Sequence, residues 1–264
     1  MASTAMYAAI SGAQAQQLRI DTIANNVANV NTTGFKGMEA SFADVYYTNQ
    51  KRAGILENAE ASVRPTGVQN GLGTKILGTY RNMQLGALKQ TQHPLDIAIT
   101  GWGYFAVSLP NGRTGYTRAG TFQRDPDTGN IVTSDGNSLA TPISIPANIN
   151  TEDVQISNSG LVTAQDPNDP TNIIEIGQLE AFTFTNEAGL EAIGNNLLVE
   201  TRASGEAVAI EDVNNRFKQY FLEGSNVSAV EELTKLIEAQ RAYELNTRVV
   251  STQDKILEST NNIK

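Results

Sequence analysis

Residues 101–106 (Gly-Trp-Gly-Tyr-Phe-Ala) have the spacing closest to a ligand-binding motif in this sequence. They nearly match the Gly-x-Gly-x-x-Gly pattern, in which backbone amides at the start of a helix bind a dinucleotide pyrophosphate. That chemistry needs a helix after the glycines, whereas residues 104–109 continue as a predicted strand and then meet Pro110. We therefore predict a glycine-containing β-bend, with Trp102 packed against the domain, and no nucleotide site.

Residues 125–130 (Asp-Pro-Asp-Thr-Gly-Asn) carry oxygen ligands of the kind found in calcium loops. The twelfth position of such a loop requires a bidentate Glu, and Gly136 occupies it here, so we predict a hairpin turn. His93 is the single histidine, and a histidine-based metal site or catalytic triad would rest on it alone. No pair of carboxylates follows an acid–base motif. The sequence therefore predicts no enzyme activity, no metal and no cofactor.

Composition excludes several classes of protein. The net charge of -9, without a run of Lys or Arg, argues against a surface for nucleic acid or anionic membranes. The absence of cysteine removes disulfides, thiolate metal sites and cysteine nucleophiles. No basic region followed by an apolar block opens the chain, and no apolar run is long enough to span a bilayer. We therefore expect neither a cleaved signal peptide nor membrane insertion.

Residues 227–264 predict one long helix with an apolar seam that it cannot bury alone. Ser228 and Glu231 form a predicted capping box, and Glu231 and Glu232 oppose the positive end of the helix dipole. Glu231 and Lys235 are spaced to pair on the outer surface. The seam comprises two sets of heptad positions: Ala229, Leu236, Tyr243, Val250 and Leu257, and, four residues after the first four, Leu233, Gln240, Thr247 and Asp254.

Residues 3–33 predict the second long helix, and residues 31–34 are expected to end it, with Gly34 as a left-handed cap. Steps of three and four residues define its seam: Met6, Ala9, Ala13, Gln16, Ile20, Ile23, Val27 and Val30. The alanines make the first half of this helix thin enough for another helix to approach closely. The isoleucines and Val27 provide most of the burial.

The middle of the chain predicts an antiparallel β-domain between these helices. Periodicity is weak over residues 36–90, which we interpret as extended chain with a long loop and one or two strands at 68–80. Short apolar runs separated by Gly-, Asn- and Asp-containing turns follow over residues 91–201. The predicted fold class is α+β, with an antiparallel coiled coil of the two terminal helices. The predicted segments are 1–35 (helix), 36–90 (linker and loop), 91–201 (β-domain), 202–226 (return linker) and 227–264 (helix).

The two seams can bury each other within one molecule, or they can pack between molecules. Polar seam residues such as Gln16, Gln240 and Asp254 favour the second possibility. So does the length of the C-terminal helix, about 50 Å at roughly 1.5 Å per residue, which exceeds what one domain needs. For packing between subunits we predict Met6, Ala13, Ile20, Ile23, Val27, Val30, Leu233, Leu236, Ile237, Gln240, Tyr243, Val250 and Leu257.

Four ordered motifs resemble the bacterial flagellar axial proteins, the rod and hook family. The motifs lie at 23–36, at 95–105, at 116–122 and, as a C-terminal block, at 222–227 with 238–244. The likeness spans the whole chain. The motif residues that we single out are Asn25, Asn26, Asn29, Gly34, Phe35, Gly101, Gly103, Phe105, Arg241 and Tyr243.

The resemblance implies a structural subunit of the basal body that polymerises into the distal rod, the hollow and rigid driveshaft that transmits torque from motor to hook and carries the export channel. The terminal helices are then expected in the inner layer of the tube, the β-domain outside, and residues 36–90 against neighbouring subunits. Chain length and the Arg-Ala-Tyr-Glu stretch at 241–244 favour the distal rod. A proximal rod protein or the hook protein stays as an alternative within the family.

The resemblance also implies partners and a location. The partners would be other copies of the chain, proximal rod proteins below, the hook protein above, the surrounding P- and L-ring bushing proteins and the flagellar type III export apparatus. The location would be the periplasmic part of the basal body, with termini that become ordered only on assembly. Two alternatives of other classes are a secreted adhesin, with the β-domain on a helical stalk, and a hydrolase dependent on His93.

Overall fold

The computed structural model describes residues 4–51, 66–166, 169–210 and 216–262, and these form two compact units. The helical unit comprises residues 4–28, 38–51, 66–80 and 228–262. The β unit comprises residues 29–37 and the described residues between 81 and 227. The predicted α+β class is confirmed, since long helices at both ends of the chain accompany a central set of antiparallel strands.

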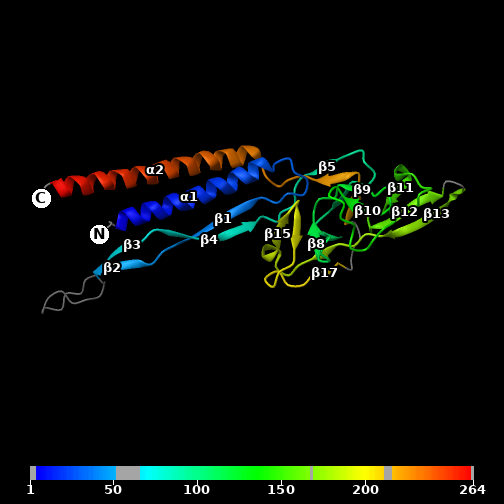
Figure 1. Ribbon diagram of the computed structural model, residues 1–264, viewed down its shortest axis with the longest axis horizontal. Coiled ribbons are helices and arrows are strands. Elements are labelled where there is room, and N and C mark those ends of the chain that lie inside the picture. Colours follow the sequence, from blue (N-terminus) through cyan, green and yellow to red (C-terminus); the bar gives the residue numbers. More distant parts are fainter. Residues whose placement is uncertain (1–3, 52–65, 167–168, 211–215, 263–264) are drawn as a thin grey trace. The chain divides into compact units, whose positions relative to one another are not determined.

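The helical unit is built on α1 (Thr4–Ala28) and α2 (Ala229–Asn262), which lie side by side and run in opposite directions (Figure 1). Both long helices were predicted, but α1 ends at Ala28, before the predicted stop at 31–34. The reason is local hydrogen bonding: the Thr32 N–H donates to the Asn29 carbonyl, and the Thr32 hydroxyl donates to the Asn29 side chain. Such side-chain and turn bonds compete with the helix ladder. Val30, a predicted seam residue, therefore lies outside the helix.

Two short β-ribbons complete the helical unit. Strand β1 (Met38–Asp44) pairs with β4 (Thr74–Arg81), and β2 (Tyr47–Lys51) pairs with β3 (Val68–Gly71). The strands predicted within 68–80 are thus confirmed, whereas residues 52–65 of the predicted loop lie outside the described residues. Gly73, at φ 106°, lies so close to α1 that a Cβ there would be 2.2 Å from the Ser11 Oγ. Only glycine permits this approach of the ribbon to the helix.

The β unit contains the remaining strands, all in antiparallel pairs among those whose register is defined. They are β5 (Leu88–Gln90), β6 (Ile97–Ile99), β7 (Phe105–Ser108), β8 (Thr114–Thr117), β9 (Phe122–Arg124), β10 (Ile131–Thr133), β11 (Val154–Ile156), β12 (Leu161–Asp166), β13 (Asp169–Gln178), β14 (Phe182–Thr183), β15 (Glu191–Gly194), β16 (Leu197–Val199), β17 (Val208–Ala209), β18 (Phe217–Gln219) and β19 (Phe221–Glu223). The largest sheet has the order β15-β16-β8-β7, and a three-stranded sheet has the order β11-β12-β13.

The described residues of the predicted return linker (202–226), namely 202–210 and 216–226, belong to the β unit. They contain β17, β18 and β19, which pair with β14, β6 and β5. Phe217 in β18 is 1% exposed, so the segment closes the core rather than leading away from it. Ile143 and Ile145 are each 1% exposed, but their segment forms no strand and makes an isolated bridge between Ser144 and Asn130.

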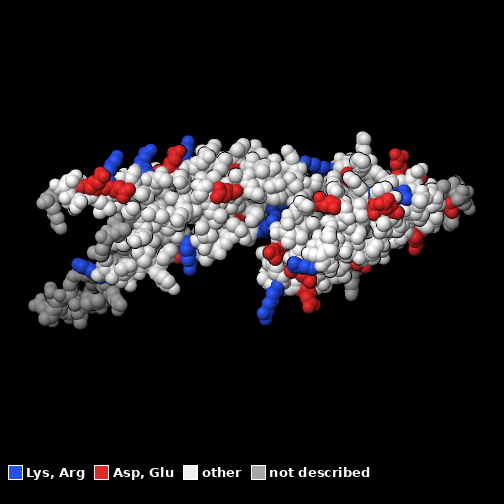
Figure 2. Space-filling model, in the orientation of Figure 1, with Lys and Arg blue, Asp and Glu red and all other residues white. Residues whose placement is uncertain are grey.

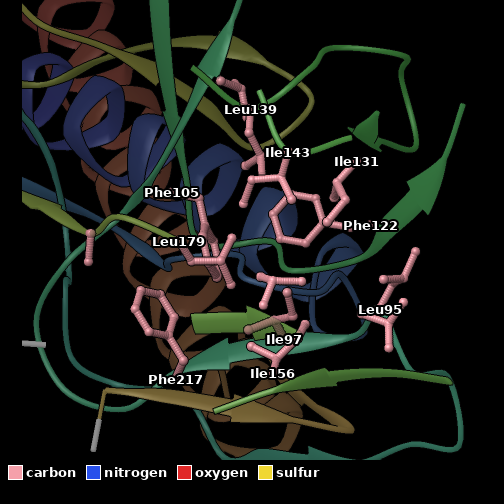
Figure 3. Packing of buried hydrophobic residues seen from close by; sticks show 14 of the residues in the cluster. Leu95, Ile97, Phe105, Phe122, Ile131, Leu139, Ile143, Ile156, Leu179 and Phe217 are labelled. Carbon is pink, nitrogen blue, oxygen red and sulfur yellow. The ribbon is translucent and has the colours of Figure 1, made fainter. Parts of the chain in front are cut away.

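One contiguous cluster of buried apolar side chains forms the core of the β unit, with members from β6, β7, β9, β10, β11, β16 and β18 (Figure 3). The rings of Phe105 and Phe122 meet edge to face at 5.0 Å, and the ring of Phe217 lies 6.0 Å from that of Phe105. Edge-to-face pairs add to the stabilisation that comes from burial alone. The β unit therefore has one contiguous hydrophobic core of its own.

The bend at 101–103 shows one wrong prediction and one confirmed one. Residues after the bend continue as strand β7, as predicted, but Trp102 is 64% exposed and does not pack against the domain. Gly101 and Gly103 have φ values of 94° and 136°, which turn the backbone so that Tyr104 and Phe105 enter the interior instead. The turn at 125–130 joins β9 to β10 as a hairpin, as predicted, and the Gly129 N–H donates to the Asp125 carbonyl.

Candidate functional site

Three buried charged side chains meet inside the β unit: Lys36, Glu223 and Arg118, which we call the ion cluster. The Lys36 Nζ lies 2.6 Å from Glu223 Oε1 and 2.6 Å from the Gln84 carbonyl oxygen, to which it also donates. The Arg118 Nε lies 3.4 Å from Glu223 Oε2. All three side chains are at most 4% exposed.

Burial and the contacts among these side chains shift pKa values in and beside the ion cluster. Desolvation lowers the pKa of Lys36, and the hydrogen bond to Glu223 opposes that effect. The nearby Glu187 carboxyl has a raised pKa because it is desolvated, although Arg118 and Tyr104 act in the other direction. Buried charges that retain partners are costly to separate, so the ion cluster fixes the segments that contribute to it.

The residues in and around the ion cluster come from the four sequence motifs. Lys36 ends the first motif, and the Gly34 N–H donates to the Glu223 carbonyl of the last. Arg118, from the third motif, donates from Nη2 to the Gly101 carbonyl of the second at 2.7 Å. Gly34 has a φ of 69°, and a Cβ there would lie 2.6 Å from the Ala119 amide nitrogen. Parts of all four motifs therefore meet at one junction in the β unit.

Asn226 completes this junction, and sequence reasoning missed it. Its Oδ1 accepts from the Gly37 N–H at 2.8 Å, and its Nδ2 donates to the Asn82 carbonyl at 2.8 Å. The side chain thus satisfies backbone groups of two segments far apart in sequence. No spacing rule could have found this role, since the partners are backbone atoms.

A second polar cluster, centred on Asn26, joins α1, β1 and α2 in the helical unit through hydrogen bonds. Its Nδ2 donates to the Met38 carbonyl and its Oδ1 accepts from the Met38 N–H, both at 2.8 Å, which attaches β1 to α1. The same Nδ2 lies 3.0 Å from Glu232 Oε2, which attaches α2 as well. Lys235 Nζ lies 2.6 Å from Glu232 Oε1, and this contact raises the pKa of Lys235.

Glu232 lies in the first turn of α2, where it was predicted to oppose the helix dipole. The sequence did not indicate its second role: the side chain is 6% exposed and its carboxylate contacts Asn26 of α1. The ion pair of Lys235 is with Glu232 and not with the predicted partner Glu231. A carboxylate in a helix seam is missed by an apolar pattern, because the pattern scores only hydrophobic positions.

The seam of α2 is rotated from the predicted one. Besides Glu232, two further residues of α2 face α1 or the interior. Ala239 is fully buried. A Cβ added at Gly12 of α1 would lie 3.1 Å from the side chain of Asn246. The predicted second set of heptad positions, four residues after the first, is exposed instead. Gly12 of α1 leaves room for the Asn246 side chain, because it has no Cβ to meet it.

The predicted packing residues accordingly fall into three groups. Ile23 is buried, whereas the half-buried ones are Met6, Ala13, Ile20, Val27, Val30, Leu236, Tyr243 and Val250. Leu233, Ile237, Gln240 and Leu257 are exposed. Among the motif residues, Asn26, Gly34, Phe35, Gly103 and Phe105 are buried, Asn29 and Gly101 are half-buried, and Asn25 and Arg241 are exposed.

Other chemistry has little support in the part of the chain that the structure describes. His93 is exposed, and the described residues include no group of three or more His, Cys, Asp or Glu side chains arranged to hold a metal ion. None of the described helices has the length and apolar character needed to cross a membrane. Within each of the two polar clusters, the side chains bind protein backbone and one another, which is a structural role.

Known proteins match the chain along most of its length. Residues 6–36 match the family described as "Flagella basal body rod protein", residues 98–164 the "Flagellar hook protein FlgE/F/G D1 domain", and residues 218–263 the "Flagellar basal body rod FlgEFG protein C-terminal". The flagellar basal-body rod protein FlgG of Caulobacter vibrioides is 45% identical, over 98% of this chain and 99% of the relative. FlgG of Borreliella burgdorferi is 42% identical over 98% of both chains. The flagellar hook-basal body complex protein FlhP of Bacillus subtilis is 30% identical over 94% of both.

Fold and site together define a structural protein, one whose polar clusters hold its segments in place and whose paired terminal helices leave apolar side chains exposed. The chain belongs to the flagellar basal-body rod protein family, as the full-length relatives show. It is a structural subunit of the flagellar rod that assembles with further copies and other flagellar components.

Proposed function

We propose that this chain polymerises into the distal rod, with α1 and α2 as an antiparallel coiled coil in the inner layer of a hollow tube. The rod is the driveshaft between motor and hook, and the chain has no catalytic role. The observation that carries the proposal is the exposed apolar surface of the helical unit, in a chain whose relatives are rod proteins. On α2 alone, Val230 is 76% exposed, Leu245 60% and Ile237 52%.

An exposed surface of this kind is unfavourable in a solitary soluble protein. Burying a large aliphatic side chain contributes about 1.5–3 kcal/mol, and soluble monomers rarely leave such residues in continuous stripes. Contacts with neighbouring copies would bury these side chains and order the helix ends, which are expected to be mobile in the free subunit. The predicted packing residues, from Met6 to Leu257, are proposed for these contacts, together with the ribbons within residues 36–90.

The proposal includes the surroundings of the rod. Proximal rod proteins would lie below the polymer, the hook protein above it, and the P- and L-ring bushing proteins around it. The flagellar type III export apparatus would deliver the chain to the periplasmic part of the basal body. A chain without cysteine suits export in an unfolded form, since no disulfide has to form or break.

The test replaces half-buried Leu236 in α2 with aspartate. A charge in the helix seam should prevent assembly, because it would be buried without a partner when copies pack. Electron microscopy of basal bodies from cells carrying Leu236→Asp should show no distal rod, and the cells should not swim. The β unit should remain folded, which circular dichroism of the purified chain measures.

Leu236→Met is the matched control, because it preserves the size and apolar character of the side chain. Cells carrying it should build rods. Normal rods and normal swimming with Leu236→Asp would contradict the proposal. Loss of the β unit's folded signal in that variant would show a folding defect instead, and purified unsubstituted protein that never forms tubes at high concentration would also count against the proposal.

A further inference from the structure

The helical unit has an open groove of about 330 Å³ between α1 and α2. It is lined by Ile10, Ala13 and Gln14 from α1 and by Tyr243, Thr247 and Val250 from α2. No charged side chain lines it. A groove with apolar walls and neutral polar rims suits aliphatic side chains of a partner helix better than a charged ligand.

The first turns of α2 carry an apolar ridge that no described part of the chain covers. The ridge consists of Val230, Leu233 and Ile237, which are 76%, 49% and 52% exposed. Their spacing of three and four residues aligns them on one face of the helix. The opposite face of α2 carries Glu232, which bonds to Asn26 of α1, and Ala239, which is fully buried.

We propose that the ridge of one copy occupies the groove of the next copy in the polymer. The inference rests on the proposed function and specifies which surfaces of two neighbouring subunits meet. The three ridge residues are apolar and the residues that line the groove are uncharged, so the contact between these residues buries no charge without a partner. Figure 2 shows wide areas without Lys, Arg, Asp or Glu between the charged groups on its visible face, which is the surface character such packing needs.

The ridge cannot fill the groove of its own molecule. The ridge and the α2 wall of the groove lie on the same helix, with their centres roughly 13 residues or about 20 Å apart. The contact must therefore join two copies, and because ridge and groove are different surfaces it is heterologous. Such a contact leaves a free ridge at one end and a free groove at the other, so it propagates an open polymer. Contacting copies are displaced by about 20 Å along α2.

Disulfide cross-linking tests this contact directly, since the chain contains no cysteine. The double variant Ile237→Cys with Thr247→Cys has one thiol on the ridge and one in the groove. Within one molecule these positions are about 15 Å apart along the helix, beyond the reach of a disulfide. Oxidation of assembled rods should give a ladder of dimers, trimers and larger species in non-reducing electrophoresis.

Ile237→Cys with Thr252→Cys is the matched control. Thr252 is exposed on α2 and its hydroxyl donates to a helix carbonyl, as that of Thr247 does, but it does not line the groove. This pair, and each single variant alone, should give at least tenfold less cross-linked product. Where the double variant assembles poorly, co-assembly of the Ile237→Cys and Thr247→Cys single variants measures the same contact as a dimer band.

Each other outcome has a defined meaning. Rods that form normally but give no ladder, or equal ladders from both pairs, overturn the ridge-and-groove contact and leave the rod function intact. Dimers from Ile237→Cys alone would show that two ridges meet, and a product containing a different protein would show another occupant; both overturn the inference. Failure of the unsubstituted chain to form rods would instead contradict the proposed function.

Discussion

The two units of this chain bury their apolar side chains to very different extents. In the β unit the core cluster includes Phe105, Phe122 and Phe217, and several members are fully buried. Among the described residues of the helical unit, the buried apolar side chains are Ala9, Ala15, Ile23 and Ala239. Only one of these is larger than alanine. The β unit therefore has a hydrophobic core of its own, whereas the helical unit leaves many of its large apolar side chains exposed.

The polar clusters show the same difference. In the ion cluster, Lys36 and Glu223 are at most 3% exposed, so water does not compete for their contacts. In the helical unit, Glu232 is buried but its partner Lys235 is 42% exposed. A half-open ion pair contributes little net stability and can rearrange. The comparison suggests one unit that is complete before assembly and one that is completed by it.

The largest effect should follow from Glu223→Ala. Removing this carboxylate leaves the cations of Lys36 and Arg118 buried without their partner, which typically costs about 3–5 kcal/mol. Urea unfolding of the purified chain, followed by circular dichroism of the β unit, measures the loss. Glu191→Ala is the control: Glu191 is exposed, and its removal should change the free energy of unfolding by less than about 0.5 kcal/mol. Equal effects of the two substitutions would mean that the ion cluster does not hold the β unit together.

A smaller and local effect is expected from Asn26→Ala. The substitution leaves both backbone groups of Met38 and one oxygen of Glu232 without a buried partner, at a cost of about 1–3 kcal/mol. Amide exchange at Met38 and in the first turns of α2 should accelerate, whereas exchange in the β unit should not change. Gln14→Ala, at an exposed position of the same helix, is the control. Acceleration throughout the β unit would show that the units do not fold separately.

Much of this architecture could be predicted from the sequence because its signals are local. Helical periodicity predicted α1 and α2, and alternating runs between turn residues predicted most strands of the β unit. The hairpin at 125–130 followed from its turn residues. These features depend on neighbours along the chain, which a sequence displays directly.

The errors concern contacts between distant segments. Phe217 and its strand were assigned to a linker, because a three-residue strand has no periodicity of its own and forms only against β6. Trp102 was expected to pack against the domain, but the backbone geometry at two glycines directs its neighbours Tyr104 and Phe105 inward instead. The roles of Glu232 and Asn226 depend on partners about 190 to 206 positions away. No local pattern contains that information.

The smallest predicted effect concerns Glu187, a half-buried residue of the β unit whose pKa is raised, chiefly by desolvation. The folded state then holds the proton at pH values where the unfolded state has released it. Stability from this group is fully present below about pH 4.5 and is lost as pH rises through the raised pKa. Glu187→Gln removes that titration, so the variant should gain stability relative to the unsubstituted chain as pH increases through this window. Urea unfolding at several pH values measures the difference, with exposed Glu191→Gln as the control. A difference between Glu187→Gln and the unsubstituted chain that is constant with pH would show that this carboxyl does not couple to folding, and would weaken the distinction between a closed β unit and an open helical one.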